Sequence, residues 1–341
     1  MKRPFRGLGR GAGPRRCYDV LVIGSGIGGL TCANLLARAG LSVLLAEQHY
    51  VVGGYCSSFR RGGYVFDAAS HFYPLLGNPA TLTGRLLADL GVATKWVKMD
   101  PVDQFHLPDG THFAVPAEFD PYLARLKAEF PGEVAAIDEF FRLARQAYLL
   151  GLLCYFRGRG PGPLGPLAGL TVRAVLDRLF RDPRLKLLLT ADCPHWGSPP
   201  SRTSFVFDSM LRISYFLGNY YPCGGSQAFA DELAQRFEEA GGDILLCAPV
   251  KRILVRGDKV CGAVVETGHA RARRDQEVRT TAVVSNADML QTVEQLLGPE
   301  VLPPEYVARA RRLRPSFPCF LTHLGVRDVP AEVLSRVHGY H

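Results

Sequence analysis

A cluster of glycines near the N-terminus has the spacing of a phosphate cradle. The run Gly24-Ser25-Gly26-Ile27-Gly28-Gly29 directly follows a short apolar segment and opens a helix-forming one. In such a turn the first glycine permits a tight bend, the second lets the backbone approach a diphosphate, and the last brings helix and strand together. The unpaired N–H groups at a helix N-terminus also favour negative charge. We therefore predict that these six residues hold the diphosphate of a dinucleotide.

An acidic residue closes the same unit. Glu47 ends a second apolar segment, and Gln48 follows it. A carboxylate at this place accepts hydrogen bonds from ribose hydroxyls and repels a 2′-phosphate, which disfavours NADP. Glu47 and Gln48 are therefore the predicted residues on the ribose side of the cofactor.

A second glycine pair distinguishes between the possible dinucleotides. Gly53 and Gly54 lie shortly beyond Glu47, where their backbone could approach the same diphosphate without a Cβ in the way, and Ser58 offers a hydroxyl nearby. An NAD domain would normally continue into further βαβ units, whereas loops and short strands follow here. A cofactor held by two loops is resident rather than exchangeable, so the sequence favours FAD. No His or Cys stands in an attachment motif, so we expect the FAD to be noncovalent.

The rest of the sequence offers little independent chemistry. It has no G-x-S-x-G elbow, no H-E-x-x-H pair and no P-loop. The nine cysteines are scattered without a C-x-x-C pair, so neither a disulfide framework nor a metal site is expected. Cys193 and His195 would supply only two of the four ligands of a tetrahedral site. Chemistry that the side chains cannot perform by themselves must therefore come from the cofactor.

The elements that must position the glycines form a βαβ unit. The apolar run 19–23 predicts a strand buried on both faces, 30–39 predicts a helix, and 41–46 predicts a second strand. The predicted fold class is α/β: a Rossmann-type FAD-binding domain with a parallel sheet and helices, plus an α+β substrate domain inserted in sequence.

Further elements are predicted along the rest of the chain. Phe229, Leu233 and Phe237 share one face of a helix that begins at Ser226. Strands follow within 243–267, with a turn at Gly257 and Asp258, and again over 280–284. Residues 120–216 are predicted to be mainly helical, with an inward face formed by Ile137, Phe141, Ala144 and Tyr148. A strand-like run covers 317–326.

These elements divide the chain into alternating parts. The expected domains are a basic glycine-rich tail (1–17), the first part of the FAD-binding domain (18–94), a mainly helical substrate domain (95–222), the second part of the FAD-binding domain (223–295) and a return to the substrate domain (296–341).

Charge and hydropathy limit the partners. The net charge of +8 belongs mainly to the first sixteen residues, which hold six Lys or Arg and no acid, so nucleic-acid binding is not expected. The tail lacks the apolar run of a secretory signal, and the cysteines suit a reducing compartment, so we expect a cytoplasmic, plastid or other organelle interior. No run is long enough to span a bilayer. The longest apolar run, 147–156, is expected to be a buried helix end, with a substrate tunnel or a peripheral membrane contact as alternatives.

The glycine and acidic motifs carry a family resemblance. Residues 18–72 resemble the N-terminal FAD fingerprint of the phytoene desaturase, carotenoid isomerase and retinol saturase family, within the amine-oxidase-like flavoproteins. The second half of that fingerprint is matched by Gly53-Gly54 with Ser58 and by Gly63 with Asp67. The segments 221–253 and 283–288 resemble later parts of the family, and the likeness is much less specific over 120–216.

The resemblance implies roles for several residues. It places the glycines of 24–29 on the diphosphate, Glu47 on the adenosine ribose, and Gly53 and Gly54 near the diphosphate and flavin. Val250 would hold the adenine through its backbone, and Asn286 belongs to the later strand of the cofactor site. The sequence departs from the pattern at Ala69, where the family usually has glycine. It also has no match after Asn286 to the segment that closes over the flavin ring, so we expect a truncated chain.

The resemblance also implies the substrate, a long apolar conjugated polyene. The reaction would be desaturation, saturation or cis–trans isomerisation. The aromatic residues expected near the substrate are Phe72, Tyr73, Tyr215, Tyr220 and Tyr221. His71 follows the Asp67 loop and is the candidate catalytic group, although a structural histidine would have the same setting.

Three other functions compete with this prediction. An amine- or porphyrinogen-oxidase-like flavoenzyme shares the fingerprint. An inactive, truncated flavoprotein would also carry it. Proteins of the GDP-dissociation-inhibitor type share the domain plan but lose the full glycine fingerprint, which this chain keeps.

Overall fold

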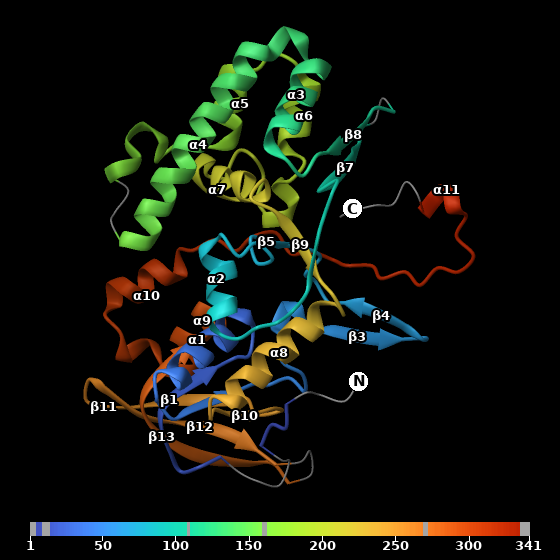
Figure 1. Cartoon of the computed structure of the whole chain (residues 1–341). Coiled ribbons are helices and arrows are strands. Elements are labelled where there is room, and N and C mark those ends of the chain that lie inside the picture. The colour runs from blue at the N-terminus through green and yellow to red at the C-terminus, as the bar shows by residue number, and fades with distance from the viewer. Residues whose placement is uncertain (1–4, 9–13, 108–109, 159–161, 269–271, 335–341) are drawn as a thin grey trace. The chain divides into compact units, whose positions relative to one another are not determined.

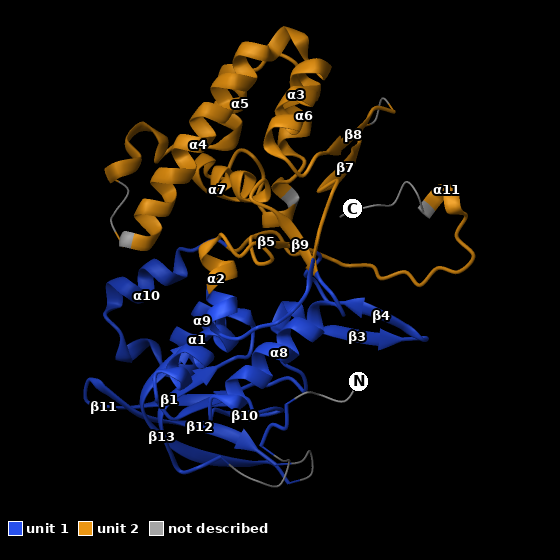
Figure 2. Ribbon diagram, viewed as in Figure 1, with its two compact units in different colours: residues 1–71, 86–96, 222–314 blue, residues 72–85, 97–221, 315–341 orange. Residues whose placement is uncertain are grey.

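The computed structural model describes the chain except for residues 1–4, 9–13, 108–109, 159–161, 269–271 and 335–341 (Figure 1). The described residues form two compact units (Figure 2). Unit 1 comprises residues 1–71, 86–96 and 222–314, and unit 2 comprises residues 72–85, 97–221 and 315–341. Each unit is therefore assembled from segments that are far apart in sequence.

Apart from shifts of one or two residues and the inclusion of the tail in unit 1, the unit boundaries differ from the expected domains at two places. Residues 72–85 belong to unit 2, in which β5 (Tyr73–Pro74) pairs with β9 (Asn219–Pro222). Residues 296–314 belong to unit 1, in which α10 (Pro304–Arg311) packs against α9 (Met289–Gln291).

Unit 1 is built on a six-stranded sheet. Its strands are, in chain order, β1 (Cys17–Ile23), β2 (Val43–Ala46), β10 (Asp243–Leu245), β11 (Val250–Arg256), β12 (Lys259–Thr267) and β13 (Arg274–Ser285). The order in the sheet is β10-β2-β1-β13-β12-β11. The pairs β10–β2, β2–β1 and β1–β13 are parallel. The four residues of β2 and the last four of β1 are all buried, as expected for a central parallel strand, and the α/β class is confirmed.

Two strands extend this sheet in the antiparallel sense. β11 and β12 are joined by Gly257 and Asp258 alone, and so short a connection can link only antiparallel strands. β13 is shared between the two arrangements, since it runs parallel to β1 on one side and antiparallel to β12 on the other. The predicted strands within 243–267 are confirmed, and the sheet is mixed rather than wholly parallel.

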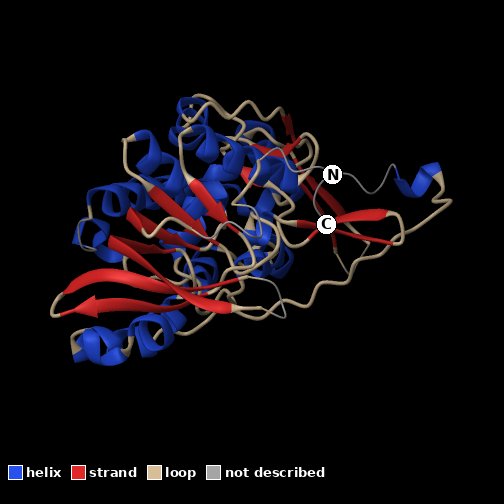
Figure 3. Ribbon diagram, turned by 90° about the horizontal axis from the view of Figure 1, so that it is seen from below, coloured by secondary structure: helices blue, strands red, loops and turns tan. Residues whose placement is uncertain are grey.

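Helices and short strands complete unit 1, and Figure 3 distinguishes helices from strands by colour over the described part of the chain. They are α1 (Ile27–Arg38), η1 (Gly54–Cys56), β3 (Ser58–Arg61), β4 (Tyr64–Asp67), α8 (Ser226–Glu239), η5 (Thr292–Leu297) and η6 (Pro299–Val301), besides α9 and α10. α8 packs against α1, and the buried Asn34 amide nitrogen of α1 donates to the Leu233 carbonyl of α8 at 2.9 Å. Phe229, Leu233 and Phe237 are fully buried, as their helical spacing predicted.

Unit 2 is mainly helical. Its helices are α3 (Phe119–Glu129), η2 (Pro131–Glu133), α4 (Val134–Arg157), η3 (Gly162–Leu167), α5 (Val172–Leu179), α6 (Pro183–Thr190), η4 (Cys193–Trp196), α7 (Phe205–Tyr215) and α11 (Ala331–Leu334). Its strands besides β5 and β9 are β6 (Trp96–Lys98), β7 (Asp103–His106) and β8 (His112–Val115). A unit boundary falls within α2 (Leu82–Asp89), β6 and β9. Ile137, Phe141 and Ala144 of α4 are buried in the core of this unit, while Tyr148 is half-buried.

The end of α4 corrects one expectation. Ala147 is buried, but Leu149, Tyr155 and Phe156 are 60%, 75% and 62% exposed, so the run 147–156 is not a buried helix end. The helix is covered on one face only. There Gly151 lies so close to α7 that a Cβ would come within 2.7 Å of the Met210 sulfur. Among the described residues no helix is both long and apolar enough to cross a membrane.

The predicted strand at 317–326 is wrong. No residue of the segment lies in a strand, and Phe320 is 94% exposed. Apolar alternation creates a strand only where a neighbouring strand supplies hydrogen bonds, and no ladder involving these residues occurs in the described part of the chain. Phe317 instead donates its amide to the Gly197 carbonyl at 2.7 Å.

A buried ion pair crosses the interior of unit 2. The Arg212 guanidinium is 3% exposed and makes two hydrogen bonds of 3.1 Å to Asp208, which is fully buried on the same helix. Arg212 also donates to the Leu189 carbonyl at 2.7 Å and lies 3.5 Å from an Asp192 oxygen. These contacts tie α7 to the end of α6.

Carboxylates outnumber cations in this interior. Asp103 and Asp192 are 7% and 8% exposed, and their oxygens lie with a His195 ring nitrogen in a group whose members are all within 4.8 Å of one another. Burial raises the pKa of Asp103 to about 7, although the hydrogen bond from the Gln104 amide opposes the shift, and the charge of Asp192 adds to it. Burial likewise raises the pKa of Asp192 to about 6, although Arg212 opposes that shift. Near neutral pH the group therefore retains protons that exposed carboxyls would have lost.

These pKa shifts predict that Asp103 makes unit 2 less stable as the pH rises. The folded-state pKa lies above the unfolded value of about 3.9, so the contribution of Asp103 falls between about pH 4 and pH 7. Asp103→Asn cannot ionise, so its free energy of unfolding relative to the parent should increase between pH 5 and pH 8. Urea unfolding at both values measures this, with Asp120→Asn, an exposed change on α3, as the control. A difference that stays constant with pH would contradict the shifted pKa.

Candidate functional site

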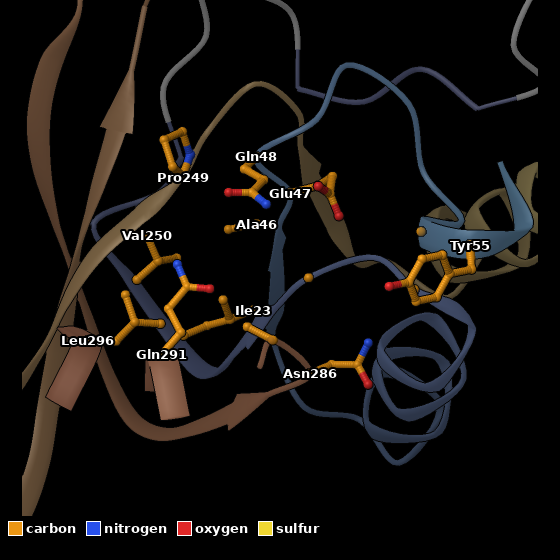
Figure 4. A pocket seen from close by; sticks show the side chains of 14 residues that line it. Ile23, Ala46, Glu47, Gln48, Tyr55, Pro249, Val250, Asn286, Gln291 and Leu296 are labelled. Carbon is orange, nitrogen blue, oxygen red and sulfur yellow. The ribbon is translucent and has the colours of Figure 1, made fainter. Parts of the chain in front are cut away.

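A cavity of about 400 Å³ opens in unit 1 where the parallel strands end (Figure 4). Its lining includes Ile23, the last residue of β1, Ala46, the last residue of β2, and Asn286, which follows β13. Ligands of open α/β sheets bind outside the carboxyl ends of the strands, and the volume suits a sizeable small molecule. This cavity is the candidate binding site.

The glycine turn forms one wall with bare backbone. Gly24 and Gly26 line the cavity, and Gly24 has a φ of +90°, which an L side chain rarely adopts. A Cβ at Gly29 would lie 2.1 Å from the Gly24 carbonyl oxygen, so this glycine allows α1 to start against β1. α1 begins at Ile27 without a side-chain cap, which leaves its first N–H groups available to an anion.

The Asn286 side chain explains two further glycines. A Cβ on Gly28 would lie 2.8 Å from its amide oxygen, and one on Gly26 would lie 3.0 Å from its amide nitrogen. The Asn286 backbone amide also donates to the Ile23 carbonyl at 2.8 Å. Asn286 therefore packs on the glycine turn from β13 and lines the cavity, as Figure 4 shows.

The second glycine pair lies directly beside the turn. Gly53 pairs with Gly26 in an isolated parallel bridge, and its amide donates to the Ser25 carbonyl at 2.9 Å. Gly54 lines the cavity, and a Cβ there would lie 3.2 Å from the Gly26 Cα. Two backbone segments without side chains thus face the space that a diphosphate would need.

Glu47 is oriented before any ligand arrives. One oxygen accepts from the Ser25 amide at 2.7 Å and the Ser25 hydroxyl at 2.6 Å, and the other accepts from the His49 amide at 2.7 Å. Glu47 is 7% exposed and lines the cavity. A carboxylate has about four acceptor positions, so one remains for a ligand hydroxyl.

Twelve of the thirteen predicted cofactor residues divide into two groups. The seven that line the cavity are Gly24, Gly26, Glu47, Gln48, Gly54, Val250 and Asn286. The others support it from behind: Ser25 bonds Glu47, Gly53 bonds the turn, and Ile27, Gly28 and Gly29 form the first turn of α1. The Ser58 hydroxyl is engaged by Asp67 at 2.6 Å and is not part of the lining.

Sequence reasoning missed several lining residues. Gln291 of α9 and Leu296 of η5 face the Val250 side of the cavity, and Tyr55 stands at its other end (Figure 4). Pro249 and Ala287 complete the lining. The strand ends Ile23 and Ala46 could have been found from the parallel-sheet prediction, whereas nothing in the sequence identified Gln291 or Leu296.

The predicted catalytic and substrate residues lie outside the cavity lining. His71 is the last residue of the first segment of unit 1. Phe72 and Tyr215 of unit 2 are in contact, with ring centroids 5.4 Å apart, and Phe72 also lies 6.0 Å from the His195 ring. Tyr73 pairs with Tyr220 between β5 and β9, and Tyr221 follows on the same strand. The part that these residues play stays a prediction.

The chain matches known proteins over most of its length. The sequence profile of the flavin containing amine oxidoreductase family matches residues 27–332. An all-trans-retinol 13,14-reductase of Rattus norvegicus is 32% identical over 83% of this chain and 49% of its own length. An inactive all-trans-retinol 13,14-reductase of Danio rerio is 31% identical over the same shares. The chloroplastic prolycopene isomerase of Daucus carota is 28% identical over 93% of this chain and 54% of its own length.

The chain thus spans about half the length of the curated relatives that it matches. A solved oxidoreductase of Methanosarcina mazei superposes with a TM-score of 0.61 at 20% identity, over 86% of this chain and 64% of that one. At that identity the likeness concerns the fold alone.

The close approach of α1 to β1 predicts that Gly29 cannot gain a side chain without a loss of stability. Gly29→Ala places a Cβ 2.1 Å from a backbone oxygen that cannot rotate away. We therefore expect the free energy of unfolding to fall by about 1–3 kcal/mol or more. Gly132→Ala is the matched control, because nothing lies within 4 Å of its Cβ position. Urea unfolding of both variants measures the difference, and equal stability would contradict this packing.

Proposed function

Because the chain belongs to the flavin containing amine oxidoreductase family, we propose that it binds FAD noncovalently and acts as an oxidoreductase on a long apolar conjugated polyene. The observation that carries the cofactor is the cavity lined by Gly24, Gly26, Gly54 and Glu47. The polyene is supported by the relatives, whose names specify a retinol reductase and a prolycopene isomerase.

The residues of the cavity fit the adenosine diphosphate part of FAD. Gly24, Gly26 and Gly54 present backbone rather than side chains, and the first turn of α1 favours the diphosphate charge. Glu47 keeps one acceptor position for a ribose hydroxyl. The adenine belongs between the Val250 backbone and the Gln291 side chain, which line the opposite end.

The bound FAD would supply hydride and electron transfer, and the chain supplies binding and orientation. Glu47 fixes the ribose, and the two glycine segments fix the diphosphate, so the rest of the cofactor has a defined point of attachment. We propose that the aromatic pair Phe72 and Tyr215 of unit 2 forms part of an apolar surface for the polyene. His71 remains the proposed polar group of the reaction.

The proposed activity is tested by product analysis. The purified chain is loaded with FAD and incubated without oxygen, with and without a chemical reductant, with all-trans-retinol or with prolycopene. We expect one of the two polyenes to be converted, and chromatography distinguishes a saturated product from an isomer. Conversion of an amine under oxygen, with neither polyene changed, would favour the amine-oxidase alternative. Flavin uptake with no conversion would favour an inactive flavoprotein.

The role of Glu47 predicts a specific loss of affinity. Glu47→Gln keeps the size of the side chain but turns an amide group toward ribose or backbone donors, so FAD should bind about tenfold or more weakly. Fluorescence titration of the apoprotein measures the dissociation constant, with Glu239→Gln at the exposed end of α8 as the control. Equal affinity would show that Glu47 does not face the ribose. Flavin retained by acid-precipitated protein would contradict noncovalent binding.

A further inference from the structure

The loop that carries Gly53 and Gly54 is enclosed on two sides. On one side Gly54 lies against Gly26 of the diphosphate turn, where its Cβ would come within 3.2 Å of the Gly26 Cα. On the other side Gly53 lies against α8, where its Cβ would come within 2.8 Å of the Ala230 Cβ. The position of α8 therefore sets how closely this loop approaches the turn.

One side chain of α8 holds both ends of the loop. The Gln227 amide nitrogen donates to the Val52 carbonyl at 3.1 Å, and the Gln227 amide oxygen accepts from the Ser58 amide at 3.1 Å. The same nitrogen donates to Asp231 at 2.8 Å, one turn further along the helix, which orients the Gln227 amide. Val52 is fully buried, so its carbonyl depends on this partner.

A neighbouring residue of α8 anchors the β3–β4 hairpin that follows the loop. The buried Ser226 hydroxyl donates to one Asp67 oxygen at 2.8 Å, and the Ser58 hydroxyl donates to the other at 2.6 Å. The start of α8 therefore fixes the loop where it begins, at Val52, and where it ends, at Ser58. None of these groups lines the cavity, so their contribution to a ligand is indirect.

We infer that Gln227 is a positioning residue for the cofactor: it clamps Val52 and Ser58, and so holds the Gly53–Gly54 backbone against the diphosphate turn. The inference rests on the proposed FAD site and adds to it a determinant that lies outside the cavity. It assigns to α8 a function besides packing against α1, because the Gln227 amide group connects the helix to both ends of the loop.

The test compares two glutamines of the same helix. Gln227→Met removes the three hydrogen bonds while keeping the length of the side chain. Gln235→Met makes the same change at a position whose side chain, among the described residues, bonds Glu239 on the surface. We expect Gln227→Met to weaken FAD binding by about tenfold and to speed FAD dissociation, while Gln235→Met leaves both unchanged. Hydrogen exchange of the Ser58 and Gly53 amides in the apoprotein should accelerate only in Gln227→Met.

The possible outcomes distinguish a failure of the inferred role of Gln227 from a failure of the proposed FAD site. A parent that binds FAD, with a Gln227→Met variant of equal affinity and equal amide protection, overturns the inference and leaves the proposed function standing. A parent that takes up no flavin overturns the proposed function and the inference with it. A loss of affinity accompanied by an equal fall in the urea midpoints of both variants would show general destabilisation and also overturn it. If Gln227→Met does not fold, Gln227→Glu replaces it: its carboxylate accepts from Ser58 but cannot donate to Val52.

Discussion

The distance between α1 and β1 is the constraint on which unit 1 depends. The helix starts so close to the strand that the Gly24 carbonyl and the Gly29 Cα leave no room for a side chain. This contact aims the first turn of α1 into the cavity and lets Gly53 pair with Gly26. Asn286 then closes the turn from β13. The glycines are thus required by the close packing of backbone segments and of the Asn286 side chain around the turn, and the resulting surface without side chains suits a diphosphate.

Glu47 takes part both in the packing of the glycine turn and in the proposed selectivity for the nucleotide. Its carboxylate is held by Ser25 and His49, so it contributes to the stability of the turn as well as facing the cavity. A group fixed in this way needs little ordering when a ligand binds, which lowers the entropic cost of recognition. In the proposed FAD site the same charge would repel an additional phosphate on the ribose. Under that proposal one residue serves both the fold and the choice of nucleotide.

Short-range patterns could be predicted from the sequence, and long-range placement could not. The glycine turn, Glu47, the helix face of Phe229, Leu233 and Phe237, and the Gly257 turn each follow from neighbouring residues. Gln291 and Leu296 reach the cavity from elements that have no motif, and Gln227 acts through contacts with residues about 170 positions away. The exposed end of α4 and the segment 317–326, which does not form a strand, were not predicted, because apolar patterning does not specify what covers a surface. Nothing in the sequence indicated that Asp103 is buried, because the burial of one carboxyl group depends on how the whole of unit 2 packs.

The central strand of unit 1 has a consequence for synthesis of the chain. β1 pairs on one side with β2, which follows it closely, and on the other with β13, which ends at Ser285. At roughly 5–20 residues per second, a ribosome needs on the order of 12–50 s to supply that second partner. Until then one edge of an apolar strand is open to other chains. The nascent protein therefore has a long interval in which chaperone binding competes with aggregation, and the first two segments of unit 2 emerge during that interval.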